Sequence, residues 1–342
     1  MKVIQRIRSN HSGNLENVLP DFQRKYARGY RAFFGFENKS NPFFGPLICA
    51  ANNPARDVDW ATAIAVAFGK SPYVMALGAY SFNQFVHGRF SLGLGSQIRP
   101  HIERRYGMPW TDKPAVQMRE YVHASHAIWD AFEDGKPLKF EGQTYRHTLM
   151  TPEFAAYNAG YGRPRVLIGA VGPGMTDAAV DVADGLITHS FVSEKSLREI
   201  NYPRILERLK KHNKPRSAFE IQLPLFIVTG STAEEFDKNL AWHRHRIGFY
   251  ASTPAYKIQL DLFGWGEVHD ETRRLTREGR WDELGRPITD EMLQTFAVIG
   301  EPKEIAPKIK QRFGDFIDTI QSNLELQDEE IQYRIIKDIE AI

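Results

Sequence analysis

Short runs rich in β-branched and aromatic residues alternate with longer amphipathic runs along this chain of 342 residues. Repeated strand-then-helix units are typical of parallel sheets, because parallel strands need a long crossover connection between them. The predicted strands span residues 2–7, 32–36, 60–67, 90–95, 165–170, 185–189, 221–229 and 316–321. Eight such units at this length predict a (β/α)8 TIM barrel, and an open doubly wound sheet is the alternative.

Two stretches are too long for a simple strand–helix unit. We therefore predict a single domain over 1–342 with insertions at about 97–160 and 251–300. Within the first, PLKFEGQTYRH (137–147) alternates apolar and polar residues around a glycine, which predicts a β-hairpin. Insertions in barrel loops usually shape the active site, so we expect these two segments to determine the substrate.

Charge and cysteine content exclude several classes of protein. A formal net charge of +2 provides no strong field for nucleic acid or for a membrane surface. Cys49, the single cysteine, lies in the apolar run PLICAA, so we expect a buried, unreactive thiol. The first ten residues lack the apolar core of a signal peptide, and no run approaches the roughly 20 apolar residues of a membrane span. We expect a soluble, cytoplasmic protein.

The segment RFSLGLGSQIRPHIERRYGMPW (89–110) runs from an apolar strand through Gly93 and Gly95 into a charged helix that starts at about residue 99. In α/β enzymes the carboxyl ends of strands hold the chemistry. Glycines at that point allow a flat or anionic ligand to lie against bare backbone. We therefore predict a binding loop after this strand.

Small side chains mark the end of another predicted strand, ATAIAVAF (61–68). Its first part suits the crowded interior of a barrel. At its end, the small residues Ala65, Val66 and Ala67 would let a planar ring rest on the backbone. We predict that this strand end is part of the same site.

A third strand end is followed by glycines and a helix in IGAVGPGMTDAAVDVADGL (168–186). Free backbone N–H groups at a helix start, together with the helix dipole, bind anions. The turn Gly172-Pro173-Gly174 therefore predicts a phosphate site, with an ordinary strand-to-helix loop as the alternative.

Polar residues at or just after three strand ends are candidates for proton transfer or hydrogen bonding. In GFENKSNPFF (35–44), Glu37 and Asn41 would face the barrel mouth, unless Asn41 only caps a helix that begins at Pro42. His101 follows the 93–97 loop and His189 ends the run GLITH. Imidazoles at such positions suit proton transfer near neutral pH.

The sequence indicates neither a metal site nor a serine hydrolase. We find no group of residues with the spacing of metal ligands and no G-x-S-x-G motif.

Taken together, these segments resemble the luciferase-like monooxygenase superfamily, and in particular its branch of oxidoreductases that use the deazaflavin coenzyme F-420. The resemblance covers roughly residues 30–320. It rests on five segments in the family's order: TAIAVAF with SPYVMA, RFSLGLGSQIRPHIERRYGMPW, YRHTLMTP, AVGPGM with VADGL, and FYASTPAY.

The resemblance implies a (β/α)8 barrel with a flavin-type ring at its mouth and a non-prolyl cis peptide in the Ala65–Val66 region. It implies ring contacts from three residues of the loop after the fourth strand and phosphate contacts from the backbone of the turn before the next helix. These residues are Gly95, Ser96 and Gln97 for the ring, and Val171, Gly172, Pro173, Gly174 and Met175 for the phosphate. The chain departs from the family where relatives often carry a His-Asp pair and this sequence has Ser40-Asn41.

We therefore expect hydride transfer between coenzyme F-420 and a small organic substrate. Glu37, His101 and His189 are the candidate proton-handling residues, Asn41 and Gln97 would orient by hydrogen bonds, and Asn41 and Trp110 are the candidate substrate contacts. The anionic glutamyl tail of coenzyme F-420 would bind arginines near the mouth, for which Arg99, Arg104 and Arg105 are placed, unless they only solvate their helix.

Two other functions remain open at this point. One is an FMN-dependent monooxygenase supplied with reduced flavin by a partner reductase, and the other is a non-catalytic flavin-binding barrel. The expected partners are a small-molecule substrate, a flavin or deazaflavin reductase and a second copy of the chain in a homodimer, with no nucleic acid and no membrane.

Overall fold

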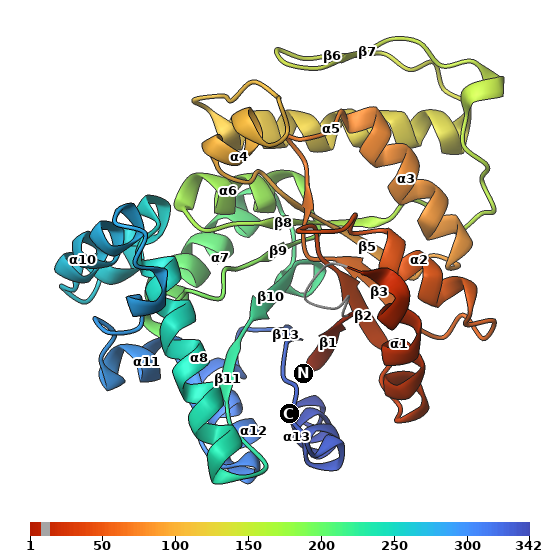
Figure 1. Ribbon diagram of the computed structural model, residues 1–342. Coiled ribbons are helices and arrows are strands. Elements are labelled where there is room, and N and C mark those ends of the chain that lie inside the picture. Colours follow the sequence, from red (N-terminus) through yellow and green to blue (C-terminus); the bar gives the residue numbers. More distant parts are fainter. Residues whose placement is uncertain (8–13) are drawn as a thin grey trace. The chain divides into compact units, whose positions relative to one another are not determined.

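Parallel strands alternate with helices through the computed structural model, which describes residues 1–7 and 14–342 (Figure 1). The chain forms two compact units. The N-terminal unit comprises Ile4–Ile187 and Glu207–Glu220, and the C-terminal unit comprises Met1–Val3, Thr188–Leu206 and Ile221–Ile342.

In the N-terminal unit, parallel strands pair side by side in the order β1-β2-β3-β5-β8-β9, and the short β4 pairs with the end of β5. Their bounds are β1 (Lys2–Arg6), β2 (Ala32–Gly35), β3 (Asp59–Thr62), β4 (Ala65–Val66), β5 (Phe90–Gly95), β8 (Arg165–Gly169) and β9 (Gly185–Ile187). The register places Phe33 opposite Trp60, Trp60 opposite Phe90 and Leu92 opposite Val166. Because all these pairs are parallel, the carboxyl ends of the strands lie along one edge.

Helices flank this sheet. They are α1 (Val18–Ala27), α2 (Phe44–Ala51), α3 (Pro72–Phe85), α4 (Arg99–Arg104), α5 (Pro114–Asp134) and α6 (Pro173–Val182). Ser71 caps α3 by accepting a hydrogen bond from Val74 N–H, with Pro72 as the first helical residue. The Trp129 indole N–H donates to Ala76 O at 2.9 Å and joins α5 to α3.

The predicted hairpin is confirmed as the antiparallel pair β6 (Phe140–Glu141) and β7 (Arg146–His147), drawn beside α5 in Figure 1. One carboxylate oxygen of Glu120 on α5 accepts hydrogen bonds from Thr144 N–H at 2.7 Å and Tyr145 N–H at 2.6 Å. The hairpin is therefore held on the helix by its own turn.

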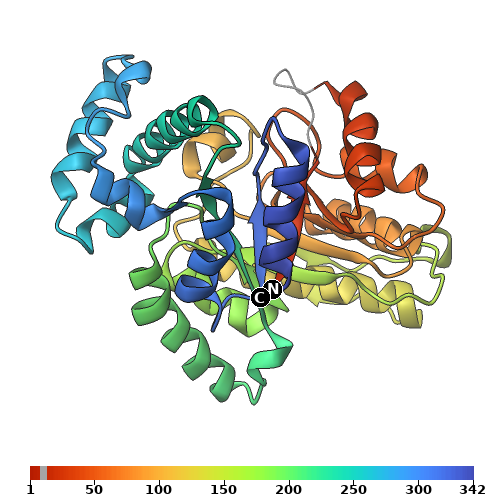
Figure 2. The same ribbon diagram turned by 90° about the horizontal axis from the view of Figure 1, so that it is seen from below.

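The C-terminal unit contains two parallel strand pairs, β10 (Glu220–Pro224) with β13 (Thr319–Ser322), and β11 (Phe226–Val228) with β12 (Ala297–Ile299). Its helices are α8 (Ala233–Ala251), α9 (Lys257–Asp261), α10 (Gly266–Arg277), α11 (Asp290–Phe296), α12 (Pro302–Phe313) and α13 (Glu329–Glu340). A buried apolar cluster that includes Phe191, Ile247 and Phe296 forms its core. The two chain ends lie side by side (Figure 2), and the Met1 amino group donates to Glu340 O at 3.4 Å.

Two of the predicted strands are each divided in the structure. The run 221–229 is two strands, because Pro224 has no N–H to continue a ladder and the chain changes partner after it. The run 60–67 is divided between β3 and β4. After β9 the chain forms a π-helix (Ser196–Asn201) that is followed by α7 (Tyr202–Lys211). Among the described residues, we find no helix that combines the length and the apolar character needed to cross a bilayer.

Candidate active site

Three predicted binding segments lie at the carboxyl ends of adjacent strands in the N-terminal unit. Strand β4 pairs with β5 through Ala65 opposite Leu94 and Val66 opposite Gly95, and Ala67 N–H donates to Gly95 O at 2.9 Å. Strand β5 in turn pairs with β8, so the loops after residues 67, 95 and 169 leave the same edge of the sheet. The structure thus brings together the residues predicted to contact a flavin-type ring and those predicted to contact its phosphate.

The glycines of β5 are required by strand packing. A Cβ on Gly93 would lie 2.0 Å from Thr62 O, and one on Gly95 would lie 2.8 Å from Ile64 Cδ1. The Thr62 hydroxyl bridges the strands, accepting from Gly93 N–H at 3.0 Å and donating to Gly93 O at 2.9 Å. The non-prolyl cis peptide expected near Ala65–Val66 is present two residues earlier, at Ala63–Ile64.

Glu37 uses both carboxylate oxygens inside the protein. Its Oε2 accepts from Val66 N–H at 2.7 Å, while its Oε1 lies 2.5 Å from Lys70 Nζ and accepts from the Tyr106 hydroxyl at 2.9 Å. The Glu37 side chain is 9% exposed and that of Lys70 is 21% exposed. Burial, together with the negative charge of Glu37, raises the pKa of Tyr106 to about 12, so this phenol is a hydrogen-bond donor at neutral pH.

Lys70 and Tyr106 were not predicted as site residues. The sequence signal for Lys70 is a lone cation in FGKSP, directly after an apolar strand and before the Ser71 cap. Tyr106 carries no comparable signal, because it follows the short helix α4 and reaches Glu37 only through the fold.

The predicted phosphate turn begins α6. Its N-cap, Gly172, is extended (φ −104°, ψ 168°), and no described side chain caps the helix. The first helical residue is Pro173, and the N–H groups of Gly174 and Met175 have no carbonyl partner within the helix. A Cβ on Gly172 would meet nothing within 4 Å, so there is open space beside these donors. A phosphate group fits this arrangement of backbone donors at the positive end of a ten-residue helix.

The other predicted contacts are placed as follows. Gln97 has a left-handed backbone (φ 64°), and its own side-chain oxygen accepts from Ile98 N–H at 3.1 Å. Trp110 packs edge-on against Phe68 at 6.2 Å between ring centroids. Asn41 is exposed and accepts from Phe43 N–H at 3.0 Å, and the helix after it starts at Phe44, not at Pro42.

The two candidate histidines differ in environment. His101 is an exposed residue of α4. His189, which belongs to the C-terminal unit, stacks on Tyr256 at 4.3 Å between centroids and meets Tyr250 edge-on at 4.6 Å. Burial and the nearby Arg246 guanidinium lower the pKa of His189 to about 3.

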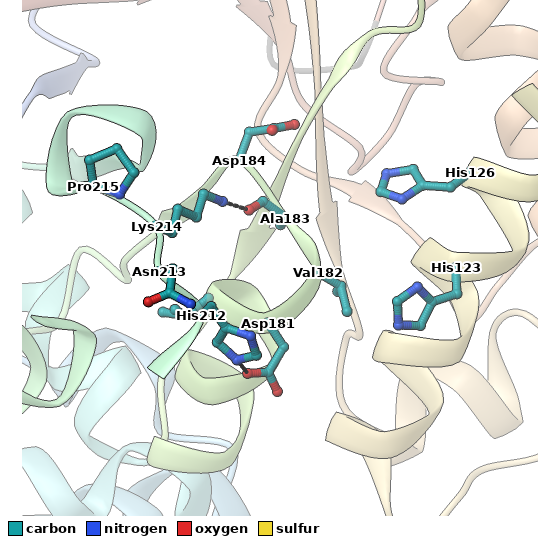
Figure 3. A pocket seen from close by; sticks show the side chains of 11 residues that line it. His123, His126, Asp181, Val182, Ala183, Asp184, His212, Asn213, Lys214 and Pro215 are labelled. Atoms are coloured by element: carbon teal, nitrogen blue, oxygen red, sulfur yellow. Dashed lines mark hydrogen bonds and ion pairs between the residues drawn. The ribbon is translucent and has the colours of Figure 1, made fainter. Parts of the chain in front are cut away.

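A pocket of about 500 Å³ opens in the N-terminal unit at the amino end of β9, which is the opposite end from these strand-end loops (Figure 3). His123 and His126 project into it from α5, while His212 contacts Asp181 at 2.8 Å and Lys214 donates to Ala183 O at 2.6 Å. Burial lowers the pKa of His126 to about 4. In a barrel this end usually serves stability, so we do not include the pocket in the candidate active site.

Residues 26–319 match the family model for luciferase-like monooxygenases, and this chain therefore belongs to that family. An uncharacterized protein of Mycobacterium tuberculosis is 41% identical over 292 residues, which is 85% of each chain. The 5,10-methylenetetrahydromethanopterin reductase of Archaeoglobus fulgidus is 26% identical over 249 residues, covering 70% of this chain and 69% of its own.

Among solved structures, the coenzyme F-420-dependent tetrahydromethanopterin reductase of Methanopyrus kandleri matches with a TM-score of 0.77 at 15% identity, covering 98% of this chain and 96% of its own. The EDTA monooxygenase of Chelativorans matches with a TM-score of 0.70 at 15% identity, covering 99% and 92%. These likenesses confirm the predicted fold: the chain is a (β/α)8 barrel of the luciferase-like type. Its relatives are oxidoreductases, as the sequence predicted.

Proposed function

We propose that this protein is a coenzyme F-420-dependent oxidoreductase that transfers hydride between the deazaflavin and a small organic substrate. The observation that carries the proposal is the cofactor of its named relatives. One such relative is a putative coenzyme F-420-dependent oxidoreductase of Mycobacterium tuberculosis, which is 24% identical over 287 residues. A further relative over 142 residues, at 27% identity, is an F-420-dependent glucose-6-phosphate dehydrogenase.

The residues of this chain fit such a cofactor. The backbone N–H groups of Gly174 and Met175 would hold its phosphate at the start of α6. The ends of β4 and β5, with buried Ala65, Val66 and Gly95, would offer the ring a surface of small side chains. When bound, the deazaflavin supplies the carbon centre that gives or takes the hydride.

Glu37 acts in this proposal as a positioning residue. Its carboxylate holds the backbone N–H of Val66 while Lys70 and Tyr106 hold the carboxylate, which fixes the strand end beneath the ring site. Proton transfer then falls to another group, with exposed His101 as a remaining candidate. Asn41 and Trp110 remain proposed substrate contacts.

Titration of the purified protein with coenzyme F-420 and with FMN, followed by fluorescence, tests the proposal. We expect micromolar or tighter binding of coenzyme F-420 and weaker binding of FMN. Binding of FMN without coenzyme F-420, together with oxygen uptake in the presence of a flavin reductase, would instead identify an FMN-dependent monooxygenase. The predicted homodimer is tested separately by light scattering of the same sample.

A further inference from the structure

The pocket at the amino end of β9 holds two charged side chains of opposite sign that lack an ion-pair partner. It has a volume of about 500 Å³, and all its lining residues belong to the N-terminal unit (Figure 3). Asp184 lies directly before β9 and Lys214 lies after α7, and both line the pocket. Within the described part of the chain neither of them forms a salt bridge, with the other or with a third residue.

Both charged groups have hydrogen-bonding capacity that the protein does not use. One carboxylate oxygen of Asp184 accepts from Val166 N–H at 2.8 Å, while the other accepts from no described residue and is not sealed from solvent. The Lys214 ammonium donates to Ala183 O at 2.6 Å, which takes one of its three N–H groups. A ligand could therefore bind to both groups without displacing a hydrogen bond of the protein.

The two charges also act on one another. Burial lowers the pKa of Lys214 and the nearby Arg165 guanidinium lowers it further, whereas the Asp184 carboxylate raises it. Asp184 and Lys214 are thus neighbours that are not in contact, and a small ligand could lie between them.

The other titratable groups of the lining add no unbalanced charge of known sign. The Asp181 carboxylate is balanced by Arg119, at 2.6 Å, and by Arg208, at 2.7 Å. His123 and His126 project from α5 on the other side of the pocket (Figure 3). Burial lowers the pKa of His126 to about 4, so this imidazole is uncharged at neutral pH and can both donate and accept.

We propose that this pocket binds a free amino acid, whose carboxylate pairs with Lys214 and whose ammonium pairs with Asp184. A simple anion would lie beside the Asp184 carboxylate and a simple cation beside the Lys214 ammonium, so each would be repelled as well as attracted. A zwitterion pairs with both groups. The volume is that of a small-molecule site, and the side chains of Val180, Val182 and Pro215 provide an apolar surface for a side chain such as that of leucine. The site is separate from the proposed cofactor site and does not depend on it.

Isothermal titration calorimetry of the whole chain without cofactor tests which charges the ligand needs. The probes are L-leucine, L-leucinamide, which keeps only the ammonium, and N-acetyl-L-leucine, which keeps only the carboxylate. We expect L-leucine to bind with a Kd below about 1 mM and each derivative to bind at least about tenfold more weakly. Equal affinity for either derivative, or no saturable binding of L-leucine and of glycine, would overturn the proposal.

Substitutions test the two contacts on the protein side. Asp184→Asn keeps an oxygen for Val166 N–H and removes the negative charge, and Lys214→Gln removes the positive charge. We expect each variant to bind L-leucine at least about tenfold more weakly. N-acetyl-L-leucine should lose no further affinity in Asp184→Asn, because it has no ammonium to pair there. Lys211→Gln removes the same charge from an exposed residue of α7 outside the lining, and it should bind normally.

A second anion site in the same unit provides the remaining control. Gly172→Val alters the turn before α6 and should leave L-leucine binding unchanged. Weaker binding in Gly172→Val, with normal binding in Asp184→Asn and Lys214→Gln, would place the amino acid at that turn and overturn the proposal. Urea unfolding shows whether each variant is folded, and Asp184→Asn decides the question if the loss of the Lys214 hydrogen bond to Ala183 O prevents folding. Unchanged affinity in folded Asp184→Asn would refute the pairing with the ammonium.

Discussion

At the scale of single residues, the hydrogen-bond partners of a side chain distinguish a catalytic group from a structural one. Glu37 lies at a strand end, as expected of an acid–base residue, but each of its oxygens already has a protein partner. A buried carboxylate with an ammonium and a phenol on one oxygen is costly to disturb, because removal of one partner leaves the others unpaired.

We therefore expect strong coupling between Glu37 and Lys70. Glu37→Gln should lower the free energy of unfolding by about 1–3 kcal/mol, since Lys70 then loses its buried counter-charge. Lys70→Met should cost a similar amount, and the double variant less than the sum. Urea unfolding of the four proteins gives the coupling energy, and strictly additive losses would show that the ion pair contributes nothing.

Gly172 offers a matching test of the phosphate loop. Its backbone is extended and open space surrounds its Cβ position, so Gly172→Val should leave folding intact. The added side chain would stand in front of the N–H groups of α6, and we expect coenzyme F-420 binding to weaken by about 1–3 kcal/mol. Gly78→Val, at an exposed and equally open position within α3, is the control that should bind normally. Equal affinity in both variants would contradict the assignment of the phosphate site.

At the scale of elements, Asp181 near the end of α6 connects three helices. Arg119 of α5 approaches it at 2.6 Å, Arg208 of α7 at 2.7 Å, and His212 just beyond α7 at 2.8 Å. Burial opposes ionisation, but the hydrogen bonds from Arg208, Arg119 and His212 outweigh it and lower the pKa of Asp181 to about 2. The Asp181 side chain is only 11% exposed, so the carboxylate at the centre of the network is shielded from solvent.

Asp181→Asn should therefore lower the free energy of unfolding at pH 7 by about 2–4 kcal/mol. A carboxyl whose pKa is lowered on folding stabilises the protein above its unfolded pKa of about 4, and this contribution is lost as the pH falls toward 2. The gap between wild type and variant in urea unfolding should accordingly shrink from pH 7 to pH 3. Asp134→Asn, which breaks an exposed pair with Lys136, should leave the free energy of unfolding almost unchanged. A pH-independent gap for Asp181→Asn would contradict the argument.

The type of an element could be predicted from the sequence where the local residue pattern alone determines it. Strand β5 has the predicted start, because an apolar run is a local signal. The partner change at Pro224 depends on which strand lies alongside, and the contact between Tyr106 and Glu37 joins residues 69 apart in the chain. In the same way, the three cofactor segments were predicted from the small residues and glycines at the ends of strands. The aromatic contacts of His189 could not be predicted, because they depend on where the fold places Tyr250 and Tyr256.

At the scale of the whole molecule, a net charge of +2 gives no general attraction for an anionic cofactor. Any preference for the glutamyl tail of coenzyme F-420 must therefore come from local cations. Of the three predicted arginines, Arg99 pairs with Glu103 at 3.0 Å and Arg105 donates to Asn38 O. Arg104 is exposed and has no ion-pair partner among the described residues, so it is the cation best placed to bind the tail.

Salt should then distinguish the two cofactors. Raising the ionic strength from about 0.1 M to 1 M shortens the Debye length from about 10 Å to about 3 Å, which weakens exposed charge pairs. We expect the Kd for coenzyme F-420 to rise by about tenfold over this range, and the Kd for FMN, which has no such tail, to rise less. Arg104→Gln should raise the low-salt Kd for coenzyme F-420 and flatten its salt dependence, whereas the control Lys136→Gln, beyond the end of α5, should change neither. Equal salt slopes for the two cofactors, with no effect of Arg104→Gln, would assign the arginines to helix solvation and leave the backbone donors of α6 as the anion site.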